Sequence, residues 1–412
     1  MKRIGQIVLG TVMVLIFVAI IYIGVVVVLS DMQQATKVTV SKALLKEELK
    51  GDNNRVAKLI SGALLVIEQE LIQERKLVAY VDNLVSDMSM DQKLAQMMIL
   101  TNEDDIIAEN LTAYQPGGII FFEIDFKGKT IDTVRSRVDT LQGYMQIPLF
   151  VGVDEEGGEV SRLKTLDETG LPAFEGARVL TNQGMDAVVK DTEQKMQYLK
   201  ELGINLNFAP VADVVEAPSS YMYLRSASGD TQVVAEYVET VLSVMQEQQV
   251  IGCVKHFPGY GDNVNTHEGL AQDSRTLLEY QEKDFIPFQA GIDAGVDMIM
   301  ISHITMNAVD NESPASLSTK VHEVLRNDLN YSGVIIADDL NMQAILKTMT
   351  IEEATAKAFV TGNDMIFSAD FAASMKGARK AVEEGSLTEE RVNESVSRIL
   401  RMKIKNGLIE IK

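Results

Sequence analysis

Short apolar runs alternate with longer amphipathic stretches from residue 84 to about residue 408, and this alternation leaves few folds open to the chain. Short runs rich in Val, Ile, Leu and Met are typical of buried strands, whereas apolar residues at helical spacing indicate helices. The longer stretches include Gln183–Glu201, Gln232–Gln248 and Ile351–Thr361. The eight strand candidates are Met97–Leu100, Gly118–Phe122, Phe150–Val153, Leu206–Pro210, Gly252–Val254, Asp297–Ser302, Val334–Ala337 and Asp364–Ser368.

Strands that alternate with helices in this way form parallel sheets covered by the helices. Eight such strands match a closed barrel, so the sequence predicts an α/β fold with a (β/α)8 TIM-type barrel over residues 84–412. An open doubly wound sheet is the alternative. The Gly-x-Gly-x-x-Gly segment that would favour that alternative does not follow the first strand.

The first thirty residues differ from the rest of the chain. Lys2 and Arg3 precede an uncharged run, residues 4–30, that is rich in Val, Ile and Leu. At about 1.5 Å per helical residue this run exceeds the roughly 30 Å thickness of a bilayer core. We therefore expect residues 1–30 to be a transmembrane helix that anchors the chain in the cell membrane by a single pass. The basic flank indicates that the remainder lies outside the cytoplasm. A cleaved signal peptide is the alternative.

Residues 31–83 are polar and carry Leu and Ile at helical spacings, with a break at residues 51–54. We predict a helical stalk or a cap on the main domain, and the pattern leaves both open.

Acidic residues outnumber basic residues by 59 to 38, which gives a formal net charge of −21. This charge opposes binding to a phosphate backbone, so no nucleic-acid partner is expected. Cys253 is the single cysteine of the chain, which excludes intramolecular disulfides and sites with several cysteine ligands.

Charged and histidine side chains stand at the ends of five of the predicted strands. Catalytic side chains of a (β/α)8 barrel come from the carboxyl ends of several strands, so this convergence indicates an active site. The residues, in strand order from the third to the seventh, are Asp154, Asp213, Lys255, His256, His303, Asp338 and Asp339.

Several motifs accompany these strand ends. They are Val151–Gly158 (Val-Gly-Val-Asp-Glu-Glu-Gly-Gly), Asn207–Val214 (Asn-Phe-Ala-Pro-Val-Ala-Asp-Val), Arg225–Ser226, Lys255–Gly261 (Lys-His-Phe-Pro-Gly-Tyr-Gly), Pro314–Ser318 (Pro-Ala-Ser-Leu-Ser) and Ala337–Met342 (Ala-Asp-Asp-Leu-Asn-Met). Together they resemble glycoside hydrolase family three, specifically its single-barrel β-N-acetylglucosaminidase (β-hexosaminidase) branch, over residues 84 to about 408. The family's counterpart of the first motif contains Asp-Gln-Glu-Gly-Gly.

The resemblance implies an exo-acting, retaining enzyme that hydrolyses terminal β-linked N-acetylglucosamine from cell-wall (peptidoglycan) fragments through a glycosyl-enzyme intermediate. Such a reaction needs a carboxylate on one face of the sugar and a proton donor on the other. Asp338 matches the family's nucleophile, with a helix N-cap as the alternative role. His267, after the fifth strand, matches the proton donor, with a solvated loop histidine as the alternative.

One position next to this histidine departs from the family. Where the family has Asp-Ser/Thr-His, the chain has Asn265, Thr266 and His267. An asparagine can accept a hydrogen bond from the imidazole, but it cannot stabilise the imidazolium by charge. Asp262 or Glu268 could supply that charge instead.

The family's sugar-binding positions are also occupied. By the resemblance, these residues bind the hydroxyl groups of a carbohydrate substrate, whereas pairs that only hold the rim together are the alternative. They are Asp154, Arg162, Arg225, Lys255 and His256. No cofactor and no metal are expected, because the chemistry needs neither and the histidines lack a zinc spacing.

Two other functions remain open at this point. The first is a phosphorylase or another β-glycosidase of the same family. Phosphate could reach the histidine more easily here, because the neighbouring carboxylate that would repel this anion is replaced by Asn265. The second is a non-catalytic, membrane-anchored protein that binds or senses sugars, and it is suggested by Asn265 together with the anchor.

Overall fold

Helix α3 (Asn53–Asp87) is the first described element of the computed structural model, which describes residues 53–102, 107–262, 269 and 271–411. The chain divides into two compact units, Met1–Lys76 and Leu77–Lys412. The expected anchor, residues 1–30, lies outside the described residues, as do residues 31–52 of the expected stalk, whereas residues 53–83 lie in α3. Within the described ranges, none of the helices combines the length and the apolar composition that crossing a bilayer requires.

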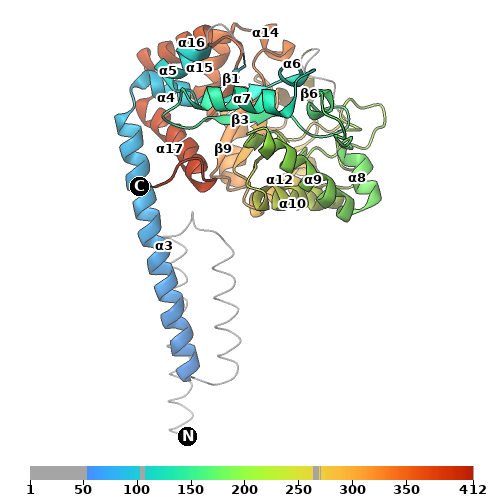
Figure 1. Ribbon diagram of the computed structural model, residues 1–412, viewed down its shortest axis with the longest axis horizontal. Coiled ribbons are helices and arrows are strands. Elements are labelled where there is room, and N and C mark those ends of the chain that lie inside the picture. Colours follow the sequence, from blue (N-terminus) through green and yellow to red (C-terminus); the bar gives the residue numbers. More distant parts are fainter. Residues whose placement is uncertain (1–52, 103–106, 263–268, 270, 412) are drawn as a thin grey trace. The chain divides into compact units, whose positions relative to one another are not determined.

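Eight parallel strands form the centre of the second unit (Figure 1). Their order in the sheet is β10-β1-β2-β3-β4-β5-β7-β9. A parallel bridge from Ile336 in β9 to Met365, next to β10, brings the two edge strands together and closes the barrel. The strands are β1 (Met98–Thr101), β2 (Gly118–Phe121), β3 (Phe150–Val153), β4 (Leu206–Asn207), β5 (Ile251–Phe257), β7 (Met298–Ile301), β9 (Val334–Ala337) and β10 (Ile366–Ser368).

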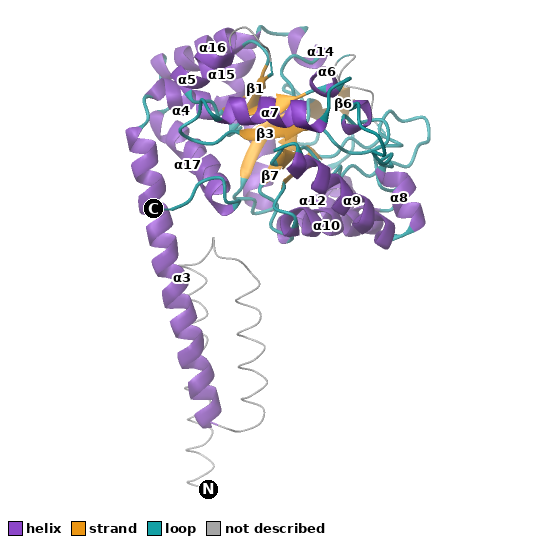
Figure 2. Cartoon of the chain, in the orientation of Figure 1, coloured by secondary structure: helices purple, strands orange, loops and turns teal. Residues whose placement is uncertain are grey.

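Helices surround these strands (Figure 2). Strands β2, β3, β5, β7 and β9 are buried along their whole length, as expected when helices cover one face and the barrel interior fills the other. The helices are α4 (Met90–Gln96), α5 (Ile107–Tyr114), α6 (Glu123–Phe126), α7 (Ile131–Gln142), α8 (Ala177–Gln183), α9 (Met185–Glu201), α10 (Thr231–Glu247), α11 (Leu277–Glu279), α12 (Phe285–Asp293), α13 (Thr319–Glu323), α14 (Gln343–Leu346), α15 (Ile351–Thr361), α16 (Phe371–Glu383) and α17 (Glu389–Lys405), with short 3-10 or π segments η1 (Leu163–Thr165), η2 (Tyr280–Asp284), η3 (Ala315–Leu317) and η4 (Val324–Asp328).

The predicted (β/α)8 barrel is therefore confirmed, with local differences. Strand β4 ends at Asn207, before the predicted end at Pro210, although the carbonyls of Ala209 and Pro210 still accept from Cys253 and Lys255 in β5. The helix predicted over Gln183–Glu201 begins instead at Met185, because Gly184, whose φ of +106° suits glycine, separates α9 from α8. A second, parallel pair of strands was not predicted; it joins β6 (Ala271–Asp273) to β8 (Ile304–Met306).

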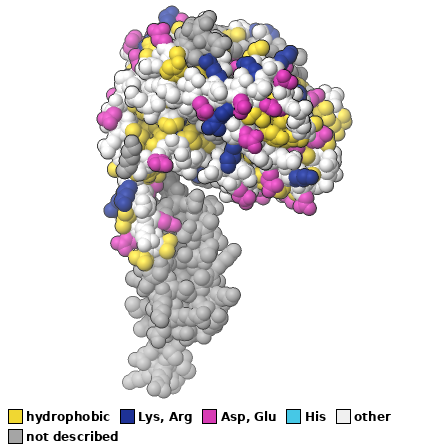
Figure 3. All heavy atoms as spheres, in the orientation of Figure 1, with side chains coloured by type: hydrophobic (Ala, Val, Ile, Leu, Met, Phe, Trp, Pro, Cys, Tyr) yellow, Lys and Arg dark blue, Asp and Glu magenta, His cyan; other side chains and the backbone are white. Residues whose placement is uncertain are grey.

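The surface of the second unit carries charges of both signs. On the face shown in Figure 3, the described acidic side chains are scattered among lysines, arginines and apolar side chains. This face, as far as it is described, has no broad basic patch of the kind that binds nucleic acid.

Lys403, in the last helix, is fully buried at the amino-terminal end of the barrel. Its ammonium donates to Oε1 of Gln96 at 3.1 Å and lies 4.9 Å from the centre of the Phe150 ring. Burial lowers the pKa of Lys403 to about 7. The folded chain therefore binds this proton less readily than the unfolded chain does between about pH 7 and pH 10.

This difference predicts that the folded state loses stability as the pH falls from about 10 to about 7. Methionine does not titrate, so the variant Lys403→Met lacks this pH dependence. The free energy of unfolding of the wild type should therefore fall by about 3 kcal/mol relative to that of the variant over this range. Urea denaturation of both proteins at several pH values measures the effect. Lys376→Met, at an exposed lysine, is the matched control and should change the free energy of unfolding by less than about 0.5 kcal/mol. A Lys403→Met difference that is constant with pH would contradict the prediction.

Candidate active site

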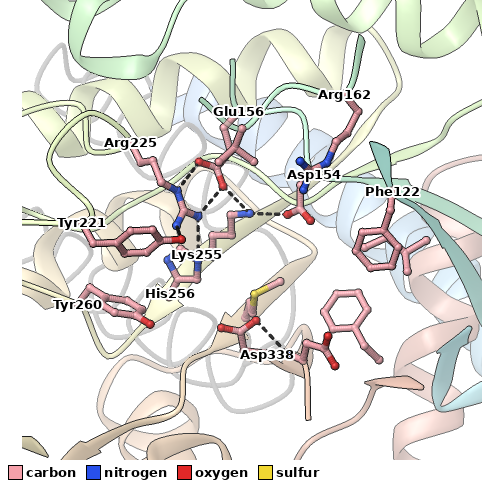
Figure 4. A pocket seen from close by; sticks show the side chains of 15 residues that line it. Phe122, Asp154, Glu156, Arg162, Tyr221, Arg225, Lys255, His256, Tyr260 and Asp338 are labelled. Carbon is pink, nitrogen blue, oxygen red and sulfur yellow. Dashed lines mark hydrogen bonds and ion pairs between the residues drawn. The ribbon is translucent and has the colours of Figure 1, made fainter. Parts of the chain in front are cut away.

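A pocket opens at the carboxyl ends of the barrel strands, as expected for this fold. Figure 4 shows Tyr221 and Tyr260 on one side of it, Phe122 on the other, and Asp338 facing a cluster of charged side chains. The lining residues are Ile120, Phe122, Asp154, Glu156, Val160, Arg162, Tyr221, Arg225, Lys255, His256, Tyr260, Met300, Asp338, Asp339 and Phe367. Seven residues predicted from the sequence thus lie in one pocket: Asp154, Arg162, Arg225, Lys255, His256, Asp338 and Asp339.

The charged cluster contains two carboxylates and two cations. Lys255 Nζ lies 2.6 Å from Oδ1 of Asp154 and 2.8 Å from Oε1 of Glu156. Arg225 donates to both oxygens of Glu156, from Nε at 2.9 Å and from Nη2 at 2.8 Å. Burial alone would raise the pKa of Glu156, but Arg225 and Lys255 outweigh it and hold this pKa far below its ordinary value. The cluster therefore carries fixed charges in a site largely shielded from water.

Lys255 has the complementary shift. Burial alone would lower its pKa, but Asp154 and Glu156 raise it above the ordinary value. Its side chain is 3% exposed and that of Asp154 is 21% exposed, so the Asp154 carboxylate is the more accessible end of this pair. A ligand in the pocket would thus meet an acceptor and a donor held next to each other.

His256 is oriented by a buried aspartate. Its Nδ1 lies 2.7 Å from Oδ2 of Asp213, and Oδ1 of Asp213 accepts the N–H of Tyr260 at 2.7 Å. Asp213 is fully buried and does not line the pocket. The Asp213 carboxylate fixes the tautomer with a proton on Nδ1 in the neutral ring, so the Nε2 edge lies towards Arg225, 3.4 Å from its Nη2.

Asp338 follows β9, and its backbone N–H donates to the carbonyl of Ile301 in β7 at 2.9 Å. Its Oδ1 accepts the N–H of Asp339 at 2.9 Å. Helix α14 begins later, with Met342 as its N-cap, so the alternative role of Asp338 as a helix cap is wrong. The Asp338 carboxylate instead faces the pocket.

Arg162 is held through its backbone by another acidic residue. Oε2 of Glu155 accepts the N–H groups of Arg162 and Leu163 at 2.7 and 3.0 Å. Glu155 is 1% exposed, and burial raises its pKa. Its backbone also pairs twice with the side chain of Asn207 in β4, so the loop after β3 is fixed to the barrel.

Two predicted catalytic residues, Asn265 and His267, lie outside the described residues. Conversely, sequence reasoning did not single out Glu156 or Tyr221. The sequence could have indicated Glu156, because it occupies the Glu position of the family's Asp-Gln-Glu-Gly-Gly motif. No sequence motif indicated Tyr221. Its hydroxyl accepts a hydrogen bond from Arg225 Nη1 at 2.7 Å.

The double pairing of Glu156 predicts a large effect on stability. Glu156→Gln removes one charge and leaves Arg225 and Lys255 close together without their shared anion, so we expect a loss of about 2–3 kcal/mol in the free energy of unfolding. Glu155→Gln is the matched control, because an amide oxygen can still accept both backbone N–H groups, and its loss should stay below about 1 kcal/mol. Chemical denaturation compares the two; equal losses would show that the ion pairs contribute little.

A barrel rim that presents several carboxylates, cations and aromatic rings in one pocket is the kind of site in which glycosidases act. The comparison with known families agrees. The model described as "Glycosyl hydrolase family 3 N terminal domain" matches residues 89–402. The chain belongs to glycosyl hydrolase family 3, and it is an enzyme of the glycoside hydrolase class.

Relatives of known sequence carry consistent names. The chain is similar to the "Beta-hexosaminidase" of Nitrosomonas eutropha, with 31% identity over 61% of this chain and 72% of that protein. It is also similar to "Beta-hexosaminidase LpqI" of Mycobacterium tuberculosis, with 29% identity over 77% of this chain and 83% of that protein.

Solved structures show the same architecture. The glycoside hydrolase family 3 beta-N-acetylglucosaminidase of Paenibacillus sp. aligns with a TM-score of 0.74 and 30% identity over 78% of this chain. The chain spans 63% of that protein's length. M. tuberculosis LpqI aligns with a TM-score of 0.69 and 28% identity, over 77% of this chain and 94% of that chain.

Proposed function

We propose that this chain is an exo-acting, retaining β-N-acetylglucosaminidase that removes terminal β-linked N-acetylglucosamine from cell-wall fragments. The observation that supports this most is the position of Asp338, whose carboxylate faces the cluster of Asp154, Glu156, Lys255 and Arg225 within one pocket. Lining residues from β2, β5, β7 and β10 and from the segments after β3, β4 and β9 surround the space, which suits one terminal sugar better than a long chain.

The proposed sugar contacts follow from the chemistry of the cluster. Asp154 accepts hydrogen bonds from two neighbouring hydroxyl groups, while Lys255 donates to one of them. Arg162 and His256 present further polar groups to the same sugar. Arg225 acts mainly by holding Glu156, since its Nε, Nη1 and Nη2 already donate within the protein. Charged hydrogen bonds of this kind are strong where water is excluded.

The proposed reaction has two steps. In the first, an oxygen of Asp338 attacks the anomeric carbon while the bond from that carbon to the leaving oxygen breaks. His267 gives its proton to the leaving oxygen, which departs as an alcohol. In the second, His267 takes a proton from water, and the water oxygen displaces Asp338 from the anomeric carbon. Two inversions restore the β configuration.

The substrate proposal rests on the names of the relatives, which are beta-hexosaminidases or beta-N-acetylglucosaminidases. We further propose that the chain acts outside the cytoplasm, anchored by residues 1–30, where cell-wall fragments occur. The apolar run and its basic flank support this location.

The test uses the purified full-length chain with 4-nitrophenyl N-acetyl-β-glucosaminide and, in parallel, 4-nitrophenyl β-glucoside. Nitrophenol should be released from the first substrate much faster than from the second, and phosphate should not be required. The sugar released first, followed by NMR, should be the β anomer.

Each other outcome would overturn part of the proposal. N-acetylglucosamine 1-phosphate formed only with phosphate would identify a phosphorylase. Preferred cleavage of the glucoside would identify a β-glucosidase, and an α anomer as first product would exclude retention. Binding of N-acetylglucosamine without turnover of any substrate would identify a sugar-binding protein.

A further inference from the structure

His303 lies between β7 and β8 and is fully buried. It was predicted as one of the polar strand ends, yet it does not line the pocket. Its Nδ1 lies 2.6 Å from Oγ of Ser316, and its Nε2 lies 2.9 Å from the carbonyl oxygen of Asp339. The imidazole therefore bridges two segments that are far apart in the sequence.

The partners determine which nitrogen of His303 carries the proton. A carbonyl oxygen only accepts hydrogen bonds, so Nε2 must donate to Asp339. In the neutral ring Nδ1 then accepts, and the hydroxyl of Ser316 is its donor. Ser316 is itself fixed, because its N–H donates to Ser302 at 3.0 Å and its carbonyl accepts from Asn363 at 2.7 Å. The Asp339 carbonyl thus sets the tautomer of His303, and the Pro314–Ser318 motif supplies the hydroxyl that donates to its Nδ1.

The other end of the bridge reaches the proposed nucleophile. Asp339 donates its N–H to Oδ1 of Asp338, while its own carbonyl is held by His303. The side chain of Asp339 accepts the N–H and the side-chain amide of Asn341, each at 2.9 Å. With its N–H, carbonyl and side chain all engaged, Asp339 has little freedom to turn. Its N–H is the group through which Asp339 contacts the Asp338 carboxylate.

We propose that His303 is a positioning residue for the nucleophile, acting from Ser316 through the backbone of Asp339 on the Asp338 carboxylate. This inference rests on the proposed function, in which Asp338 attacks the anomeric carbon. A carboxylate misplaced by about 1 Å loses much of the advantage of a fixed geometry, on the order of 10²-fold in rate. Sugar binding, which other residues carry out, should stay unchanged.

Two substitutions at one position separate the positioning role from a general structural one. In His303→Gln the amide nitrogen takes nearly the place of Nε2 and can still donate to the Asp339 carbonyl. In His303→Asn the shorter side chain keeps a polar group near Ser316 but does not reach Asp339. We expect His303→Asn to lower kcat/KM about 10- to 100-fold and His303→Gln to recover it to within about fivefold of the wild type.

The readouts are kcat/KM with the nitrophenyl N-acetyl-glucosaminide and the inhibition constant of N-acetylglucosamine, measured for the full-length chain. The inhibition constant should stay within about twofold in both variants, because it reports binding alone. Ser316→Ala, which removes the donor to Nδ1, should lower kcat/KM less than His303→Asn and serves as the second variant if His303→Asn does not fold.

Equal losses in His303→Asn and His303→Gln, or an inhibition constant that rises as much as kcat/KM falls, would overturn the inference. So would full activity in both His303→Asn and Ser316→Ala. A wild-type chain without turnover would instead contradict the proposed enzymatic function. The failure of that function and the failure of the positioning role are therefore distinguishable.

Discussion

Asp338→Ala is expected to lower kcat/KM for the nitrophenyl N-acetyl-glucosaminide by about 10⁴-fold or more. The physical reason is that the other carboxylates described in the pocket are already engaged within the protein. Asp154 and Glu156 are paired with Lys255, and Glu156 also with Arg225. The side chain of Asp339 is engaged with Asn341. Without the Asp338 carboxylate, the sugar still binds but its anomeric carbon meets no nucleophile.

Azide provides a sharper test of the same prediction. In Asp338→Ala the small anion can enter the space left by the carboxylate and attack the anomeric carbon from that face, while His267 protonates the leaving oxygen. A single displacement then converts a β-glycoside into an α-glycosyl azide, which NMR identifies. The wild type should form no such product.

Asp339→Asn is the control, because it also removes one carboxylate charge, at the adjacent residue, and keeps an oxygen that can accept from Asn341. We expect it to retain activity within about tenfold of the wild type. Near-normal hydrolysis by Asp338→Ala, or a β-glycosyl azide as its product, would show that Asp338 is not the nucleophile.

The barrel itself was predictable because its strands are short apolar runs that need little context. Phe150–Val153 and Val334–Ala337 were predicted to the residue, since both are uniformly apolar and buried on both faces. Strand β5 was predicted too short, because Lys255 and His256 interrupt its apolar composition although they continue the strand. Their polarity indicates the site, but it also interrupts the apolar run from which the end of the strand would be predicted.

The parallel pair of β6 and β8 could not be predicted from local pattern. Each strand has three residues, too few for an alternation of apolar and polar side chains to distinguish it from a loop. β6 follows β5 and β8 follows β7 in the chain, so their pairing depends on the neighbouring positions of β5 and β7 in the barrel. Short strands of this kind are determined by tertiary structure rather than by propensity.

The composition of the site followed from the sequence, whereas its connections did not. Strand ends predicted that Asp154, Lys255 and Asp338 converge, since the carboxyl ends of parallel strands meet at one rim. The pairing of Glu156 with Arg225 joins residues 69 positions apart, and the bridge from His303 to Asp339 spans 36 positions. No local periodicity encodes such contacts.

Asn265→Asp is expected to raise kcat for hydrolysis by about 10²-fold, because a carboxylate next to His267 would stabilise the imidazolium that forms when the imidazole takes a proton. The same charge favours the protonated ring and so raises the pKa of His267. The protonated ring is the form that donates to the leaving oxygen, so the alkaline limb of kcat/KM should move to higher pH. Measuring kcat and kcat/KM between about pH 5 and pH 9 tests both effects.

The chain contains a matched control for this gain of activity. Asn263→Asp adds the same charge two residues earlier, so an increase caused by net charge alone would appear there as well. Asp262, one of the two residues that could replace the missing carboxylate, already accepts the N–H of Ala217 on its Oδ1 at 3.0 Å. If Asn265→Asp leaves kcat and the pH profile unchanged while Asp262→Asn or Glu268→Gln lowers kcat, the carboxylate that assists His267 is already supplied by that neighbour. An equal rise in Asn263→Asp and Asn265→Asp would show that charge near the loop, rather than a specific partner, limits the reaction.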